Sequence, residues 1–331
     1  MRVHCPVADG SGAYIIHKML ADSINDYHVC AYNPWLTAFP PALYMLCRRG
    51  RPDLVHTTPD YSVFSKRRNI PLVITFHGYE LDKAMRKFSS PLQRLHFSTD
   101  LKWLTQRAVA CADTITAVSH YTAELVSRDL GLDKPIRVIY NGVDESRFTP
   151  EQRNRDNAST VKVLFSGNLK LRKGANLIPG IVERLNPGIE LIYTTGLRSR
   201  QQLPEHPALK CVGRVPHASM PQLYNTADIL LFPTVREGFG LAAAEAMACG
   251  LPVVATNCSA LPELVDHGMG GYLCTPDDAA AFANSINQLA DSASLRSEMG
   301  EYNRSKIEQQ FTARRMVQAY TELFEETLDK R

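Results

Sequence analysis

Short β-branched runs alternate with helical stretches along the 331 residues of this chain. In the first half, the runs RVHCPV, PLVITFHG and TITAVS alternate with patterns of helical spacing such as DLKWLTQRAVACA. The alternation restarts in the second half, where the β-branched runs are VKVLFSGN, IELIYTTG, ILLFPT and LPVVATN. This order of elements is typical of parallel α/β layers, so we predict two doubly wound domains, in residues 1–145 and 146–310.

Two further segments have patterns of their own. Residues 141–160, NGVDESRFTPEQRNRDNAST, are polar and lack periodicity, which is typical of an interdomain connection. In residues 311–331, apolar side chains such as Met316, Tyr320 and Phe324 recur at helical spacing. We therefore predict an amphipathic C-terminal helix that packs back on the first domain.

The composition is that of an ordinary soluble protein, with 44% hydrophobic and 21% charged residues. A net charge of +3 does not give the whole chain a basic nucleic-acid-binding footprint, so no nucleic-acid partner is expected. No apolar run approaches the ~20 residues that a membrane-spanning helix needs. The eight cysteines form no CxxC pair and follow no secretory segment, which favours reduced thiols and a cytoplasmic location.

Basic residues are concentrated in residues 48–107, which contain 12 Lys or Arg and 5 Asp or Glu. A solvated protein face explains this excess, and so does attraction to an anionic membrane or an acidic substrate. The run LTAFPPALYMLCRRGR, residues 36–51, is equally open, because it fits a membrane-facing helix or a core segment followed by a cap. We keep peripheral docking on the inner face of an anionic membrane, through residues 48–107, as a hypothesis.

The stretch REGFGLAAAEAMACGLPVVAT, residues 236–256, carries most of the candidate chemistry. A glycine turn follows a strand here and leads into an alanine-rich helix, whose first amides and dipole favour an anion such as a diphosphate. Glu237 and Glu245 can each accept two hydroxyl hydrogen bonds, although either alone fits a solvated surface residue. The spacing suits a nucleotide-sugar, with one carboxylate for the sugar and one for the ribose. The candidate donor-binding residues of this stretch are Glu237, Gly238, Phe239, Gly240, Leu241 and Glu245.

The segment EGFGLAAAEAMACGLPVVAT resembles the E-x7-E segment of the retaining GT-B glycosyltransferases of family GT4. Residues 166–174 (SGNLKLRKG), 211–234 (CVGRVPHASMPQLYNTADILLFPT) and 261–273 (LPELVDHGMGGYL) resemble the family in the same order. In the first half, DGSGAYIIHKML, VITFHGYE and VIYNGVDESRF do so as well. The resemblance covers nearly the whole chain. It implies the GT-B fold, in which two Rossmann-like domains face a central cleft.

The resemblance also implies roles for single positions. Lys173 matches the lysine that neutralises the donor diphosphate, which suits a cation at a strand end, although a surface lysine is the alternative. Asn168 stands where the family usually has arginine, so either Arg172 supplies the missing charge or the diphosphate is held less strongly. Gly12 matches the second glycine of a loop that approaches the phosphates, and Ser11 replaces the first glycine.

His77 follows an apolar strand and matches the histidine that lies beside the donor sugar in the resembling enzymes. An isolated histidine is more often a packed core residue, but the strand-end position favours a site. Val215, in the segment GRVPH, matches the part that contacts the base through its backbone. The other nine histidines receive no role, and His17 is interpreted as structural or exposed.

The implied activity is transfer of a sugar from a UDP-, GDP- or ADP-sugar to a hydroxyl of a carbohydrate or lipid-linked acceptor, with retention at the anomeric carbon. The catalytic residues would be His77, Lys173 and Glu237. Because lysine and backbone amides would stabilise the leaving diphosphate, we expect no metal and no further cofactor, and the chain shows no DxD motif. The resemblance places such an enzyme in the synthesis of bacterial cell-surface polysaccharide, lipopolysaccharide or glycolipid.

Three alternatives stay open at this point. A nucleotide-sugar 2-epimerase shares the GT-B fold and the donor, and differs in needing no acceptor. A non-catalytic sugar-binding protein also has two α/β lobes, but would normally carry an export signal. A dinucleotide dehydrogenase needs GxGxxG after its first strand, and this chain has Ile15 where the third glycine would stand.

Overall fold

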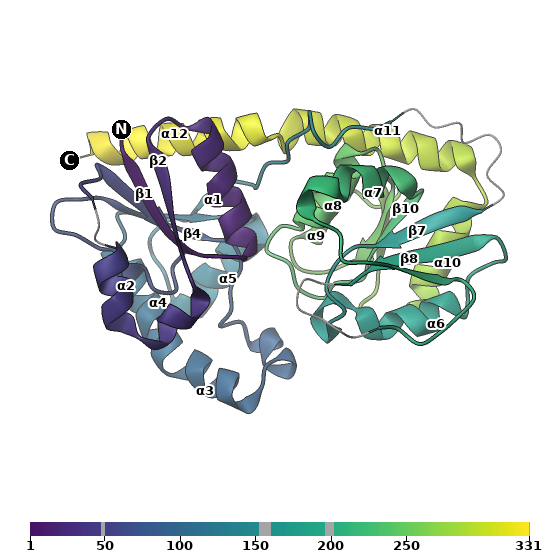
Figure 1. Ribbon diagram of the computed structural model, residues 1–331, viewed down its shortest axis with the longest axis horizontal. Coiled ribbons are helices and arrows are strands. Elements are labelled where there is room, and N and C mark those ends of the chain that lie inside the picture. Colours follow the sequence, from purple (N-terminus) through teal and green to yellow (C-terminus); the bar gives the residue numbers. More distant parts are fainter. Residues whose placement is uncertain (48–49, 152–159, 196–201, 331) are drawn as a thin grey trace. The chain divides into compact units, whose positions relative to one another are not determined.

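A computed structural model describes residues 1–47, 50–151, 160–195 and 202–330 (Figure 1). The chain divides into two compact α/β units, which are residues 1–142 with 313–331 (unit 1) and residues 143–312 (unit 2). The sequence analysis places the boundaries at 145 and 310 instead. The expected connection includes residues 152–159, and the basic stretch begins at residues 48–49, all of which lie outside the described residues.

Unit 1 contains a six-stranded parallel sheet with the order β2-β1-β3-β4-β5-β6. Its strands are β1 (Val3–Ala8), β2 (Tyr27–Tyr32), β3 (Leu54–Thr57), β4 (Leu72–Phe76), β5 (Thr114–Ala117) and β6 (Arg137–Val138). Its helices are α1 (Gly12–Ser23), α2 (Pro40–Cys47), α3 (Pro91–Ser98), α4 (Asp100–Cys111), α5 (His120–Leu130) and α12 (Ala313–Asp329). The strand order reverses between β1 and β3.

The C-terminal helix α12 is part of unit 1. Its apolar stripe is buried, and the ring of Phe324 lies 6.2 Å from that of Tyr27 on β2. The Tyr320 ring lies 4.9 Å from that of His56 on β3. The spacing of apolar residues in the last twenty positions is therefore explained by burial against this sheet.

Unit 2 contains a second six-stranded parallel sheet, with the order β12-β11-β10-β7-β8-β9. Its strands are β7 (Val161–Phe165), β8 (Ile189–Thr194), β9 (Leu209–Gly213), β10 (Ile229–Phe232), β11 (Val253–Thr256) and β12 (Gly271–Cys274). Its helices are α6 (Ile178–Val182), α7 (Met220–Thr226), α8 (Leu241–Ala248), α9 (Leu261–Leu264), α10 (Ala279–Ala290) and α11 (Ala293–Gln310). The prediction of two doubly wound α/β domains is confirmed.

The strand order of unit 2 determines where a ligand is expected. Read from β9, it is the order of dinucleotide-binding sheets, and it reverses between β7 and β10. The loops after two strands that diverge at such a point leave space at the carboxyl edge of the sheet. The segments after β7 and β10 are the ones that carry Lys173 and Glu237.

Helix α8 is alanine-rich because it is packed tightly from both sides. Ala243, Ala244, Ala246 and Ala248 are buried. On α11, a Cβ added at Gly300 would lie 2.2 Å from the carbonyl oxygen that follows α8, so the two backbones approach closely. The start of α8 is thereby fixed against the sheet. Among the described residues, no helix combines the length and apolar character needed to cross a membrane.

Candidate functional site

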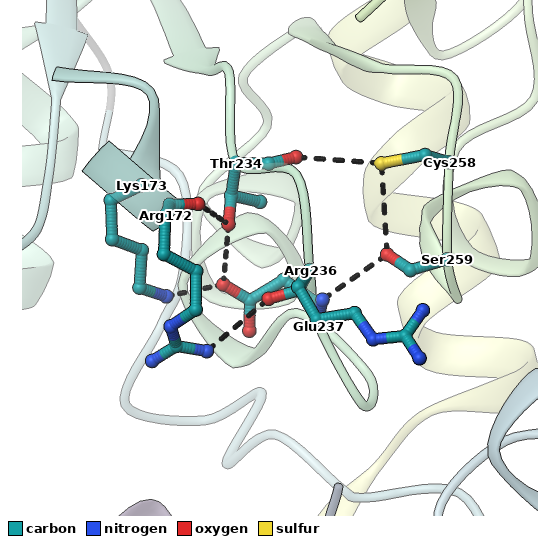
Figure 2. A network of polar contacts seen from close by, with 7 residues as sticks. All are labelled: Arg172, Lys173, Thr234, Arg236, Glu237, Cys258 and Ser259. Atoms are coloured by element: carbon teal, nitrogen blue, oxygen red, sulfur yellow. Dashed lines mark hydrogen bonds and ion pairs between the residues drawn. The ribbon is translucent and has the colours of Figure 1, made fainter. Parts of the chain in front are cut away.

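The loops after β7 and β10 meet at the strand-order reversal of unit 2 (Figure 2). Lys173 ends a 3-10 turn, η5 (Leu171–Lys173), and its Nζ forms an ion pair with Glu237 Oε1. The lysine side chain is 22% exposed and the glutamate side chain 15%. Each charge is thus largely removed from water, which strengthens its attraction to the other, and a ligand in solvent can still reach both.

The carboxylate of Glu237 is held by residues that the sequence analysis missed. Thr234 Oγ1 lies 3.1 Å from Glu237 Oε1 and 3.2 Å from the Arg172 carbonyl oxygen. The Glu237 amide donates to Ser259 Oγ, 3.1 Å away in the loop after β11. Thr234 is fully buried, and Ser259 has a φ of 52°, an uncommon conformation for serine. In the sequence, Thr234 could have been found as a site candidate because it lies at the end of the strand-like run ILLFPT.

Gly174 allows the two loops to approach. Its φ is +74°, and an added Cβ would lie 2.2 Å from the Pro233 carbonyl oxygen. Any other residue at 174 would therefore push the lysine loop away from the β10 loop. Val235 joins the loops as well, because its amide donates to the Arg172 carbonyl oxygen at 3.1 Å.

Arg172 adds a second cation to this loop. Its Nη1 donates to the carbonyl oxygen of Arg236 at 3.4 Å, and Figure 2 shows its guanidinium beside the Lys173 side chain. Asn168 lies earlier in the same loop and is half-buried, with its carbonyl accepting the Lys170 amide at 2.8 Å. The loop after β7 thus carries positive charge at positions 172 and 173, although 168 is neutral.

The start of α8 lies directly after the Glu237 loop. Gly240 is the N-cap residue with a φ of 104°, and among the described residues no side chain caps this end. The first amides of the helix have no intrahelical acceptor and carry the positive end of the helix dipole. Leu241 is half-buried. Phe239 is buried with its ring 5.5 Å from that of Phe311, so its side chain packs in the core of unit 2.

Glu245 is joined to the loop that follows β9. Its Oε1 lies 2.8 Å from His217 Nε2, and its Oε2 accepts the Tyr224 hydroxyl at 3.0 Å. Burial, together with the Glu245 charge, raises the pKa of Tyr224 well above its usual value, so this hydroxyl stays a donor. Val215, which is half-buried, lies two residues before His217. The sequence analysis missed both partners of Glu245.

In unit 1, the start of α1 explains why the chain has Ser11 where the resembling family has a glycine. Gly12 is exposed and begins α1, and Ser11 is the N-cap residue of that helix. Ser11 Oγ accepts the Tyr14 amide at 3.0 Å. Serine at position 11 therefore stabilises the start of α1, which a glycine could do only through its backbone.

His77, directly after β4, ends a chain of buried polar side chains. Its Nε2 lies 3.3 Å from His17 Nε2, and His17 Nδ1 lies 2.7 Å from the Tyr27 hydroxyl. The same hydroxyl lies 2.7 Å from His56 Nδ1, and His56 Nε2 lies 2.7 Å from Thr75 Oγ1. His17 is fully buried, as a structural histidine would be, and it is also the direct partner of His77.

The direction of hydrogen-bond donation along this chain depends on the histidine tautomers. Thr75 Oγ1 lies 2.6 Å from Thr116 Oγ1 and 3.3 Å from the Tyr320 hydroxyl, and either partner can be the donor in both pairs. When Thr75 accepts from His56 Nε2–H, His56 Nδ1 accepts the hydrogen of the Tyr27 hydroxyl. When Thr75 donates to His56 Nε2 instead, every donation along the chain is reversed.

The same logic continues to His77. In the first of these arrangements, the Tyr27 oxygen accepts from His17 Nδ1–H, His17 Nε2 accepts from His77 Nε2–H, and His77 Nδ1 carries a lone pair. In both arrangements, His77 Nδ1 is buried and has no hydrogen-bond partner among the described residues. Burial lowers the pKa of His77 to about 4, and holds the pKa values of His17 and His56 well below the usual range. All three rings are neutral near pH 7.

The candidates thus form two groups. Unit 2 brings together Lys173, Arg172 and Glu237 beside the start of α8, and links Glu245 to the loop of Val215. Unit 1 carries Gly12 and His77. In the described part of the chain, no three His, Cys, Asp or Glu side chains are grouped in a way that could hold a metal ion.

Two family models match the chain, one in each half. The model described as Glycosyltransferase Family 4 matches residues 5–147. The model described as Glycosyl transferases group 1 matches residues 160–292. Between them they cover most of the sequence.

Named relatives and a solved structure agree with these matches. N-acetyl-alpha-D-glucosaminyl L-malate synthase of Bacillus anthracis is 24% identical, over 92% of this chain and 83% of that protein. D-inositol 3-phosphate glycosyltransferase of Paenarthrobacter aurescens is 30% identical, over 64% of this chain and 55% of that protein. The crystal structure of Anabaena HepE in complex with UDP matches with a TM-score of 0.81 and 21% identity, over 98% of this chain and 100% of that one. This last likeness shows a shared fold.

Proposed function

This chain is a GT-B-fold enzyme that belongs to the group 1 and family 4 glycosyltransferases, and we propose that it transfers a hexose from a nucleoside-diphosphate sugar with retention of configuration. The observation that carries the proposal is the Lys173–Glu237 pair at the strand-order reversal of unit 2. A cation, a carboxylate and a helix start at one sheet edge suit the three parts of such a donor. The cation and helix start suit the diphosphate, and the carboxylate suits the sugar hydroxyls.

Lys173 stabilises the leaving group in this mechanism. As the glycosidic bond breaks, negative charge develops on the diphosphate, and the Nζ group has three donors for it. Arg172 and the first amides of α8 provide further donors, so the step proceeds without a divalent metal. Glu237, already oriented by Thr234 and Ser259, accepts hydrogen bonds from hydroxyls of the donor sugar.

His77 acts as a neutral hydrogen-bond acceptor. Its Nδ1 lone pair is directed by the chain through His17, and it accepts a hydroxyl hydrogen of the donor sugar. A protonated His77 would place a positive charge beside the oxocarbenium-like sugar of the transition state. The pKa of about 4 therefore favours the reaction at neutral pH.

Glu245 and Val215 bind the nucleoside. Glu245 accepts hydrogen bonds from the ribose hydroxyls, with His217 and Tyr224 fixing its carboxylate, and the Val215 backbone contacts the base. Because the solved relative is a complex with UDP, we propose a UDP-sugar as donor in preference to GDP- or ADP-sugars. Gly12 contributes the exposed start of α1 as a further phosphate contact.

The acceptor is proposed to be a carbohydrate or lipid-linked hydroxyl compound used for cell-surface polysaccharide or glycolipid. The enzyme would work in the cytoplasm, at the inner face of an anionic membrane. The names of two relatives contain L-malate and inositol 3-phosphate, both of which are anionic compounds. An anionic acceptor would suit the basic residues that are concentrated in residues 48–107. Nothing in the site favours a 2-epimerase, a dehydrogenase or a non-catalytic sugar-binding protein.

Thermal unfolding with a panel of UDP-, GDP- and ADP-sugars tests this proposal. A donor present at 100 times its dissociation constant adds about 2.7 kcal/mol to stability, so the midpoint should rise by several degrees. Release of UDP on addition of an acceptor, with an α-linked product from an α-linked donor, is then expected. An inverted product would contradict retention, and no stabilisation by any nucleotide-sugar would contradict the donor site.

A further inference from the structure

Large apolar side chains are exposed on four elements of unit 1. These elements are η1 (Pro34–Ala38) with the residue after it, α2, α3 and α4. The exposed residues are Trp35 (85% exposed), Phe39 (62%), Met45 (74%), Leu92 (77%), Leu95 (59%) and Trp103 (55%). Such a concentration of exposed apolar groups marks an interaction surface.

These elements adjoin one another in the fold. The turn η2 (Ser62–Phe64) packs against both α2 and α4, and α4 packs against α3. Tyr61, next to η2, places its hydroxyl 3.4 Å from His96 Nε2 on α3. In Figure 1, α2, α4 and α3 lie along the lower side of unit 1. We call the surface formed by η1, Phe39, α2, α3 and α4 the apolar-basic face.

Helix α3 is stabilised without burying its leucines. Ser90 and Gln93 form a capping box at its start, which satisfies two backbone donors reciprocally. All residues of α3 are described, and none of them is buried. Leu92 and Leu95 therefore contribute nothing to the core, and their exposure calls for a partner outside unit 1.

The same segment is strongly basic. Residues 83–107 contain six Lys or Arg and a single acid, Asp100. Asp100 Oδ2 lies 2.7 Å from Nδ1 of His96, which precedes it by four residues. The basic residues are all exposed, and they are Lys83, Arg86, Lys87, Arg94, Lys102 and Arg107.

A pocket of about 520 Å³ opens among these basic residues. Its wall contains the basic residues Lys83, Arg86, Arg94, Lys102 and Arg128. Of the three acids in the wall, Asp129 lies 3.2 Å from Arg128 Nε, and Asp82 Oδ1 accepts the Ala84 amide at 3.0 Å. Glu80 is the third. Positive charge therefore predominates in a concave site whose volume lies in the range of small-molecule binding pockets.

We propose that the apolar-basic face docks unit 1 on an anionic phospholipid bilayer, with a headgroup phosphate in the pocket beside α3. Trp35 and Trp103 would lie at the headgroup level, which tryptophan prefers, and Leu92 and Leu95 would enter the acyl boundary. The basic residues contact anionic headgroups. This inference deepens the membrane contact of the proposed function by naming the docking surface and its headgroup site.

The charge of the face argues for lipid over a second copy of the chain. Two copies that paired through this face would bring the basic residues of one against those of the other, and like charges repel. An anionic bilayer offers complementary charge together with an apolar layer. The combination of exposed leucines, tryptophans and unpaired positive charge suits that boundary.

The two tryptophans of the chain provide a direct test, because both lie on this face. Titration of the full chain with phosphatidylglycerol vesicles should shift the tryptophan emission to shorter wavelength, and the protein should sediment with the vesicles. Phosphatidylcholine vesicles should give at least tenfold weaker binding. Equal binding to both lipids, or sedimentation without an emission shift, would overturn the proposal.

Paired variants localise the contact. Arg94→Ser with Lys102→Ser should weaken binding to anionic vesicles about 25-fold, since each basic residue near the surface contributes about fivefold. Leu92→Ser with Leu95→Ser should weaken it at least tenfold. Met269→Ser and Lys210→Ser change exposed residues of the same types in unit 2, and should have no effect. Equal losses in these controls would overturn the assignment.

Further measurements separate this inference from the proposed function. Thermal stabilisation by UDP should be the same in the Arg94–Lys102 double variant as in the unchanged protein, which also shows that the variant folds. Size-exclusion chromatography should give a monomer at the concentrations used for vesicle binding. Bilayer docking would be contradicted by a dimer that the Leu92→Ser and Leu95→Ser substitutions disrupt. It would also be contradicted if inorganic phosphate bound saturably and abolished vesicle binding equally for both lipids.

Discussion

The two units present candidate site residues in opposite ways. In unit 2, Lys173, Arg172 and Glu237 are charged, lie in loops at the sheet edge and remain partly open to solvent. In unit 1, His77 is neutral and is oriented by a chain of side chains that passes through the core. Unit 2 is therefore suited to stabilising charge, whereas unit 1 is suited to orienting a neutral hydroxyl group.

The largest effect is expected in the charged site. Lys173→Ala should lower kcat by roughly 10²–10³-fold, because a single donor to the developing charge contributes about that much. The thermal midpoint without ligand should fall by a few degrees, because the variant leaves the largely buried Glu237 carboxylate without its cation. Steady-state kinetics with UDP release measures this. Wild-type turnover in this variant would contradict the assignment of Lys173, and Lys170→Ala, in the same loop, is the matched control.

The approach of the two loops depends on Gly174. Gly174→Ala should lower the free energy of unfolding of unit 2 by about 3 kcal/mol, from left-handed strain plus the contact with Pro233. Gly268→Ala is the control, because Gly268 has a φ of +81° and no described atom lies within 4 Å of its added Cβ. We expect about 1 kcal/mol there. Denaturant unfolding distinguishes the two, and equal losses would show that the loops do not constrain each other.

Acid should weaken unit 1 selectively. His77 is neutral in the folded protein down to a pKa of about 4, whereas an unfolded histidine protonates below about pH 6.5. The unfolded state therefore binds more protons between these values, so stability falls as the pH falls through that window. The slope is about 1.4 kcal/mol per pH unit for each such histidine. Hydrogen exchange that shows unit 2 opening first between pH 6.5 and 4 would contradict this.

A smaller effect on kcat is expected when His17, the partner of His77, is replaced. His17→Gln should reduce kcat about tenfold while leaving stabilisation by UDP unchanged, because it alters the orientation of the sugar and not the nucleotide site. Nitrogen NMR of the unchanged protein should show His77 protonated at Nε2 and unprotonated at Nδ1. The reverse tautomer would contradict the proposed role of His77 Nδ1 as a hydrogen-bond acceptor.

The smallest effect is expected at Glu245. Glu245→Gln keeps an oxygen for Tyr224 and loses the negative charge, so KM for the UDP-sugar should rise by about three- to tenfold with little change in kcat. Steady-state kinetics with varied donor measures it. A fall in kcat with unchanged KM would place Glu245 at the reacting centre instead.

The sequence predicted the charged site better than the neutral one, and the reason is physical. Lys173 and Glu237 each follow a strand, and parallel strands bring their carboxyl ends to one edge, so the strand pattern together with the family resemblance pointed to both residues. His17 and His56 come from α1 and β3, and the chain that links them to His77 depends on side-chain packing across the sheet. No spacing in the sequence records such a contact. The same holds for Ser259, whose role depends on a positive φ.

Individual residues show further limits of predicting a site from the sequence pattern. Phe239 lies between two glycines in a loop, which suggested a ligand contact, but its ring is buried against Phe311 from a distant part of unit 2. Ser11 differs from the resembling family for a local reason, since it caps α1. The exposure of residues such as Leu92 was not predicted from the sequence, because spacing alone does not reveal which helical faces find a partner.

A crystal structure with UDP bound tests the central claim most directly. The account predicts the diphosphate within hydrogen-bond distance of Lys173 Nζ and of the first amides of α8. A diphosphate bound elsewhere on unit 2, away from the loops after β7 and β10, would contradict it.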